Sequence, residues 1–184
     1  MSIAQPRIAS PAQTSELEQF DEKLRLSGSA THTLTLWLAG RLGRPDCPLL
    51  ARVRATTAPC VDRPIMDRLG VSEWAEISYR RVWLVYDRRV MSIAENWYVA
   101  SRLPRGMAAM LADGKTPFGA AIASLKPTRE TLHVDHLWRH HGQTSGDGHA
   151  PPGAVLRHQA LVRAGGGPPL CEVSEVYTRN ILAL

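Results

Sequence analysis

The chain carries ISYRRVWLVY at residues 77–86 and VMSIAENWYV at residues 90–99, two runs rich in β-branched and aromatic side chains. Such runs, joined by a short polar connection, predict a β-hairpin. Alternating apolar residues, and three glycines at 165–167, predict further strands at 49–57, 131–138, 155–163 and 170–182. An antiparallel sheet of about six strands is therefore expected.

Helical patterns come before and between these strands. A capping-box pattern at Ser15–Glu18, ahead of apolar residues at helical spacing, predicts a helix at 15–26. A second helix is predicted to end at Gly43, and short helical pieces are expected after Pro104 and at 116–119. Helices that come first, followed by hairpins, favour an α+β fold over a doubly wound one.

Length and composition are those of one globular domain. The 184 residues are 44% hydrophobic and 21% charged, and residues 1–14 are expected to be a disordered lead-in to a domain at 15–184. No apolar run reaches the roughly 18 residues of a membrane-spanning helix, and the N-terminus lacks the hydrophobic segment of a signal peptide. Cys47, Cys60 and Cys171 form no CxxC motif, so a reducing cytoplasm is expected.

The net charge of +5 does not by itself identify a partner. The basic residues are scattered singly or in pairs, without a basic helical stripe interleaved with aromatic residues, so neither nucleic acid nor a membrane is expected as a partner. A modest positive field also suits a small anion. The expected partner is a small carboxylate-bearing molecule, and the chain is expected to be a monomer or a weak homo-oligomer.

Three charged residues interrupt apolar faces of the predicted strands. Alternate side chains of a strand share a face, and Arg80, Glu95 and Glu175 each alternate with apolar residues. A buried charge is unfavourable unless a partner or a ligand compensates it. A pocket in which an arginine binds a carboxylate, and a glutamate meets a hydroxyl or accepts a proton, explains such positions.

Three alternatives to this pocket stay open at the level of sequence. Arg80 and Glu175 could form a structural ion pair with each other. Arg81 could point inward in place of Arg80, because it alternates with Trp83. Glu95 could lie solvated at the rim of the sheet.

Several short motifs, taken in order, resemble those of the chorismate lyases. They are Ser29-Ala30-Thr31, Arg80-Arg81-Val82-Trp83-Leu84, Gly114-Lys115-Thr116-Pro117-Phe118-Gly119, Thr128-Arg129-Glu130, and Pro169-Leu170 with Glu175-Val176-Tyr177. The resemblance covers roughly residues 27–182. It implies a six-stranded antiparallel sheet flanked by helices, with a buried site beneath two helical flaps.

The resemblance also implies an activity. Chorismate lyases eliminate pyruvate from chorismate to give 4-hydroxybenzoate, at the entry to ubiquinone biosynthesis, without a metal or organic cofactor. Arg80 and Glu175 would then be catalytic, with Arg80 at the ring carboxylate and Glu175 at the 4-hydroxyl end. The expected substrate-binding residues are Phe118, Gly119, Glu95 and Thr31.

This sequence departs from the family pattern at two of those positions. Phe118 stands where the family has a leucine, so the lid over the ring is bulkier. Glu95 lies near the position where the family pattern has a second arginine. A carboxylate at that position would repel a carboxylate of the substrate.

A metal site is not expected, despite several histidines in the last third of the chain. His133 and Asp135 share one face of a predicted strand and His136 lies on the other, so the three cannot bind one ion without distortion. His140, His141 and His149 lie in a segment rich in glycine and proline, 139–153, which is expected to be a mobile loop.

The competing hypothesis is a binding module. Ligand-sensing domains of some bacterial transcription regulators share the lyase-like fold and bind small effectors without catalysis. From sequence, lyase activity is the main hypothesis and a non-catalytic effector-binding domain is its alternative.

Overall fold

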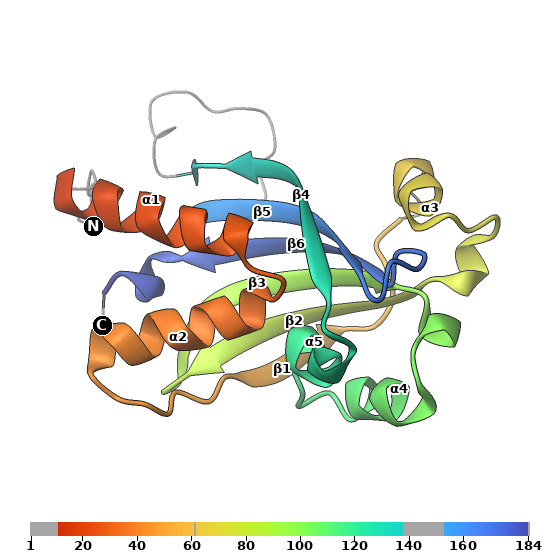
Figure 1. The fold of residues 1–184 in the computed structure, drawn as a ribbon, viewed down its shortest axis with the longest axis horizontal. Coiled ribbons are helices and arrows are strands. Elements are labelled where there is room, and N and C mark those ends of the chain that lie inside the picture. The colour runs from red at the N-terminus through yellow and green to blue at the C-terminus, as the bar shows by residue number, and fades with distance from the viewer. Residues whose placement is uncertain (1–10, 61, 138–152, 184) are drawn as a thin grey trace, which may run out of the picture.

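A single six-stranded antiparallel sheet forms the centre of the protein, in a computed structural model that describes residues 11–60, 62–137 and 153–183. The strand order is β1-β2-β3-β6-β5-β4 (Figure 1). The strands are β1 (Leu50–Ala55), β2 (Ser78–Tyr86), β3 (Arg89–Tyr98), β4 (Thr128–Asp135), β5 (Ala154–Arg163) and β6 (Cys171–Thr178). The predicted α+β class and the chorismate lyase-like fold are confirmed.

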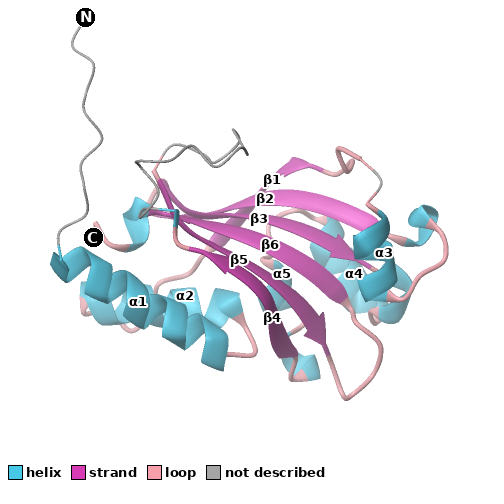
Figure 2. Ribbon diagram, turned by 90° about the horizontal axis from the view of Figure 1, so that it is seen from above, coloured by secondary structure: helices cyan, strands magenta, loops and turns pink. Residues whose placement is uncertain are grey.

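Helices cover both faces of the sheet, unequally. One face, called the inner face below, carries α1 (Pro11–Leu26), α2 (Ala30–Leu42), α4 (Arg105–Ala112) and α5 (Phe118–Ala121). The opposite, outer face carries α3 (Arg63–Leu69), which the sequence patterns did not predict. Figure 2 shows α1 and α2 beneath the sheet and α3 at its far end. No helix within the described ranges is long and apolar enough to cross a membrane.

The β2–β3 hairpin closes through a two-residue turn. Tyr86 pairs with Arg89, and the two residues between them, Asp87 and Arg88, have φ angles of 44° and 62°. Two consecutive positive φ values are those of a type I′ turn, whose twist matches that of antiparallel strands. The predicted hairpin is confirmed, with a tighter connection than the sequence suggested.

Several element boundaries differ from the predictions. Helix α1 begins at Pro11, so Ser15–Glu18 lies inside the helix and not at its start, and part of the predicted lead-in is helical. Strand β4 begins at Thr128, three residues before the predicted start, while β6 ends at Thr178. Most of the predicted mobile loop, and with it His140, His141 and His149, lies outside the described residues.

The first residues of helix α2, Ala30 and Thr31, line the pocket that is described in the next subsection. Its N-cap, Ser29, accepts a hydrogen bond from the His32 amide, and Gly43 ends the helix with a φ of 61°. Phe20 of α1 packs between Trp37 of α2 and Tyr177 of β6, with ring centroids 5.1 and 5.0 Å apart. These contacts fix both helices on the inner face.

Gly28 is expected to be required for this arrangement. A Cβ atom at residue 28 would collide with the backbone carbonyl oxygen of Pro127, which leads into β4. Gly28→Ala should therefore lower the free energy of unfolding by about 2–3 kcal/mol, measured by urea denaturation. Gly40→Ala is the matched control, because a Cβ at that exposed helical position meets nothing within 4 Å. The Gly40→Ala variant should gain about 0.5–1 kcal/mol in free energy of unfolding. Equal effects of the two substitutions would contradict the predicted collision between residue 28 and Pro127.

Candidate functional site

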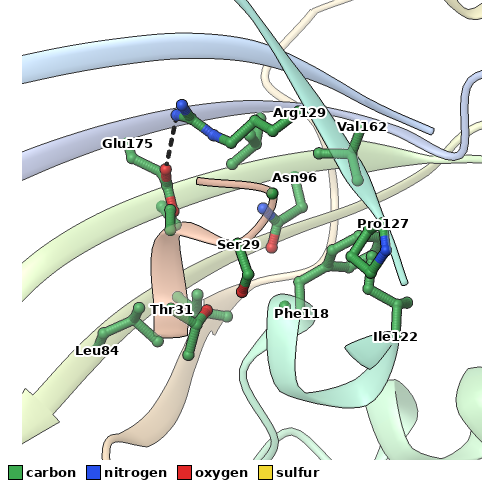
Figure 3. A pocket seen from close by; sticks show the side chains of 16 residues that line it. Ser29, Thr31, Leu84, Asn96, Phe118, Ile122, Pro127, Arg129, Val162 and Glu175 are labelled. Carbon is green, nitrogen blue, oxygen red and sulfur yellow. Dashed lines mark hydrogen bonds and ion pairs between the residues drawn. The ribbon is translucent and has the colours of Figure 1, made fainter. Parts of the chain in front are cut away.

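A pocket lies between the inner face of the sheet, the start of α2 and the short helix α5 (Figure 3). Its empty volume is about 460 Å³, a figure that includes open solvent at its mouth. The lining residues come from five strands and the segments that cover them: Gly28, Ser29, Ala30, Thr31, Val82, Leu84, Ala94, Asn96, Phe118, Gly119, Ile122, Pro127, Arg129, Val162, Val173 and Glu175.

Helix α5 forms one wall of the pocket. Phe118 is buried and packs on Tyr98 of β3, with ring centroids 5.7 Å apart. Gly119 approaches α2 so closely that a Cβ there would lie 2.8 Å from the hydroxyl oxygens of Ser29 and Thr31. Phe118, Gly119 and Thr31 therefore come together around one cavity. Their roles in binding remain predictions.

Arg129 and Glu175 form a buried ion pair at the pocket. The Nη2 atom of Arg129 donates to Oε2 of Glu175 at 3.2 Å, and the two side chains are 2% and 7% exposed. The Tyr177 hydroxyl donates to the same oxygen at 3.0 Å. Burial raises the pKa of Tyr177 well above its usual value, and the Glu175 charge adds to this, so the hydroxyl stays a donor.

Two donor atoms of Arg129 are left over. Within the described residues, neither Nε nor Nη1 has a hydrogen-bond partner, although both atoms are buried. Buried guanidinium groups normally use most of their five N–H bonds, because each unused donor has lost its water. These two donor atoms lie on different edges of the guanidinium, and each is suited to an acceptor oxygen.

Arg80 is the inward residue of β2, but it does not line the pocket. Its side chain donates from Nη1 to the Leu111 carbonyl at 3.2 Å and from Nη2 to the Thr116 carbonyl at 2.8 Å. Burial lowers the pKa of Arg80, and the carbonyl end of α4 offsets part of its charge. The structure thus joins Arg80 to the α4–α5 connection, and the alternative ion pair with Glu175 is not found among the described contacts.

Glu95 lies on the outer face, away from the pocket. It pairs across the strands with Arg81, and its carboxylate accepts a hydrogen bond of 2.6 Å from the Tyr79 hydroxyl. Burial, together with this bond, raises the pKa of Tyr79. The predicted substrate contact of Glu95 does not fit this position, and the expected repulsion of a ligand carboxylate does not arise there.

Asn96, which follows Glu95, is the polar residue of β3 that faces the pocket. It is 1% exposed and lies beside Arg80 of β2 and Val173 of β6 in the strand register. Its Oδ1 atom is buried without a partner in the part of the chain that the structure describes. The sequence patterns missed both Asn96 and Arg129, although Arg129 stands in the Thr128-Arg129-Glu130 motif.

A second buried polar group lies next to the pocket, between β5 and α1. His158, paired with Glu175 in the strand register, is fully buried, and its Nε2 atom lies 2.7 Å from Oδ1 of Asp21. Burial and the Arg129 charge lower the pKa of His158 to about 4, so the ring is neutral near pH 7. The proton on Nε2 then points to Asp21.

Asp21 accepts from two further side chains. Arg25 donates to it at 2.9 Å, and Nε2 of His136 lies 2.9 Å from its other oxygen. Burial raises the pKa of Asp21, but the bonds to Arg25 and His136 outweigh burial and leave the pKa below its usual value. This group ties α1 to β4 and β5 and takes no part in lining the pocket.

No metal site was located in the described ranges, where no three histidine, cysteine or acidic side chains are placed to hold one ion. His133 contacts Asp135 at 2.8 Å on the surface of β4, whereas His136 contacts Asp21. The two histidines therefore point to different partners, as the strand alternation predicted.

Comparison with known proteins gives one relative in sequence. No family model matches the chain. The uncharacterized protein y4mC of Sinorhizobium fredii is 33% identical over 178 residues, an alignment that covers 90% of this chain and 75% of y4mC.

Comparison of structures gives the same fold at low sequence identity. The effector domain of PhnF from Mycobacterium smegmatis has a TM-score of 0.52 and 15% identity, with 84% of this chain and 91% of that domain covered. The structure of PhnF itself has a TM-score of 0.51 and 17% identity, and the match spans 84% of this chain but 65% of that one. The ligand-binding domain of a putative GntR-family transcriptional regulator from Bordetella bronchiseptica is more distant, with a TM-score of 0.48, 12% identity, and coverage of 71% and 82%.

Proposed function

The chain belongs to the same family as the uncharacterized protein y4mC of Sinorhizobium fredii, and we propose that it is a non-catalytic effector-binding domain whose pocket holds a small organic anion with a carboxylate. The observation that carries this proposal is Arg129, a buried guanidinium that lines the pocket with two nitrogen atoms unpaired among the described residues. A carboxylate that accepts from either donor would satisfy it and add a negative charge beside a buried cation.

The charges around the pocket support an anion over a cation or a neutral ligand. Arg80 and Arg129 are both buried on the inner face. Arg129 and the carboxylate of Glu175 line the pocket, and Arg80 lies outside the lining. Glu175 offsets Arg129, while Arg80 is held by carbonyl oxygens. A bound anion would bring the local charge closer to neutral, which is favoured where water is excluded.

The placement of Arg80 favours effector binding over lyase activity. The resemblance to the chorismate lyases gave Arg80 the ring carboxylate, but its two terminal nitrogens donate to backbone carbonyls and it lies outside the pocket lining. The shared fold of the PhnF effector domain is consistent with a binding role. The comparisons lend no support to lyase activity or to a place in ubiquinone biosynthesis.

Incubation with chorismate distinguishes the two functions. Purified protein at micromolar concentration, with millimolar chorismate, is expected to release no 4-hydroxybenzoate or pyruvate above the rate without protein. Both products are quantified by chromatography over several hours, because chorismate also decays slowly by itself. Release in proportion to protein concentration, lost in Glu175→Gln, would instead establish the lyase activity.

A further inference from the structure

Asn96 presents an unused hydrogen-bond acceptor to the pocket. Its side chain comes from β3, is 1% exposed and lines the cavity beside Ala94, Val173 and Phe118, as Figure 3 shows for Asn96 and Phe118. The Oδ1 atom has no partner among residues 11–60, 62–137 and 153–183. The lining is mostly apolar, and the hydroxyl groups of Ser29 and Thr31, which also line the pocket, do not bond to this oxygen.

An unpaired buried acceptor discriminates between ligands. A ligand that supplies a donor satisfies the oxygen, whereas one that covers it with a carbon atom leaves it without water or a partner, at a cost in affinity. The apolar side chains around the amide, among them Val82, Ala94 and Ile122, make that cost larger by excluding water.

Arg129 and Asn96 require opposite groups from the same ligand. Arg129 has two donor atoms without a partner among the described residues and calls for an anionic oxygen. Asn96 has an acceptor free and calls for an O–H or N–H group. The two side chains reach the cavity from different strands, β4 and β3, on either side of β5 and β6 in the sheet order. A simple carboxylate has no donor for the Asn96 oxygen.

We propose that Asn96 is the specificity-determining residue of this pocket, and that the ligand is an apolar-bodied carboxylate which also carries a hydroxyl, amino or amide N–H group for the Asn96 oxygen. This inference rests on the proposed function, because it concerns a second group of the same bound anion. Arg129 attracts the negative charge of the ligand carboxylate. Asn96 favours those carboxylates that also carry a hydrogen-bond donor. Asn96 holds no reacting atom and takes part in no chemical step.

Matched aromatic carboxylates test the inference. Benzoate and the 2-, 3- and 4-hydroxybenzoates share the charge and the ring and differ in one hydroxyl, and their affinities are measured by isothermal titration. The wild-type protein should bind at least one hydroxybenzoate about tenfold or more tightly than benzoate. Asn96→Leu, similar in size but without the amide, should reduce this ratio to below about twofold, because it removes both the bond to the hydroxyl and the cost that benzoate incurs at the amide oxygen.

Two outcomes would overturn the inference. The first is equal affinity of the wild type for benzoate and every hydroxybenzoate, which would mean that water satisfies the Asn96 oxygen. The second is a preference that survives in Asn96→Leu, or in Asn96→Ala should the leucine variant not fold. In both cases benzoate binding that depends on Arg129 would leave the proposed function intact, whereas binding that does not depend on Arg129 would refute that function separately.

Discussion

Arg129→Gln is expected to abolish detectable binding of small carboxylates and to lower the free energy of unfolding by about 3 kcal/mol. The loss of binding follows from the removal of the two free donor atoms, Nε and Nη1. The loss of stability follows because Glu175, 7% exposed, would remain buried as an unpaired charge. Calorimetric titration with benzoate and urea denaturation measure the two effects separately.

A double variant separates these two consequences. Arg129→Gln with Glu175→Gln removes both charges, so it should recover much of the stability but none of the binding. Arg163→Gln on β5 is the matched control, because that arginine also faces a glutamate but in an exposed and long ion pair. Its side chain is 38% exposed, and its Nε atom lies 4.0 Å from Oε2 of the surface residue Glu130. It should change stability by less than about 0.5 kcal/mol. Benzoate binding that persists in the double variant would refute the role of Arg129.

The second large effect is a loss of stability in mild acid, caused by His158. The pKa of this side chain is about 4 in the folded protein against an ordinary value of 6.5, because the ring is fully buried and faces Arg129. The unfolded chain therefore binds the proton more tightly than the folded one. Stability should be full above pH 6.5 and fall by about 3 kcal/mol as the pH drops to 4.

The neighbouring carboxylate of Asp21 also makes the folded protein less stable in acid. Asp21 has a lowered pKa, so its contribution is also lost in acid, but at a pH below that of His158. His158→Gln keeps a donor for Asp21 and should flatten the slope of unfolding free energy against pH between 6.5 and 4. His133→Gln, at a side chain that is 58% exposed, should leave the slope unchanged. An unchanged slope in His158→Gln would contradict the assignment.

The sheet could be predicted from sequence because its patterns are local. Alternation of apolar residues identified β2 and β3, and Gly43 was correctly predicted to end α2. The short helix α3 was missed, because seven residues are too few to establish a helical period and it is fixed by long-range contacts. One such contact is the two-bond pair of Arg68 with Glu172, at 2.7 and 2.8 Å.

Two residues of the candidate site, Asn96 and Arg129, could not be identified from the sequence patterns, for two physical reasons. A register shift between β2 and β3, opposite Val90–Ser92, lets Met91 join the inner core and reverses the alternation after it. Counting from Met91 therefore placed Glu95 inward, where the structure has Asn96. The partner of Glu175 was also missed, because Arg129 starts two strands away and reaches it through the length of its side chain.

The central claim is that the pocket selects a small carboxylate by charge, and thermal unfolding of the wild-type protein with benzoate or benzamide tests it most directly. The two compounds have nearly the same shape and differ in charge. Benzoate should raise Tm progressively with concentration between 1 and about 50 mM, as expected for a ligand that binds the folded state alone, and benzamide should not. Equal shifts with the two compounds, or no shift with benzoate, would contradict the claim.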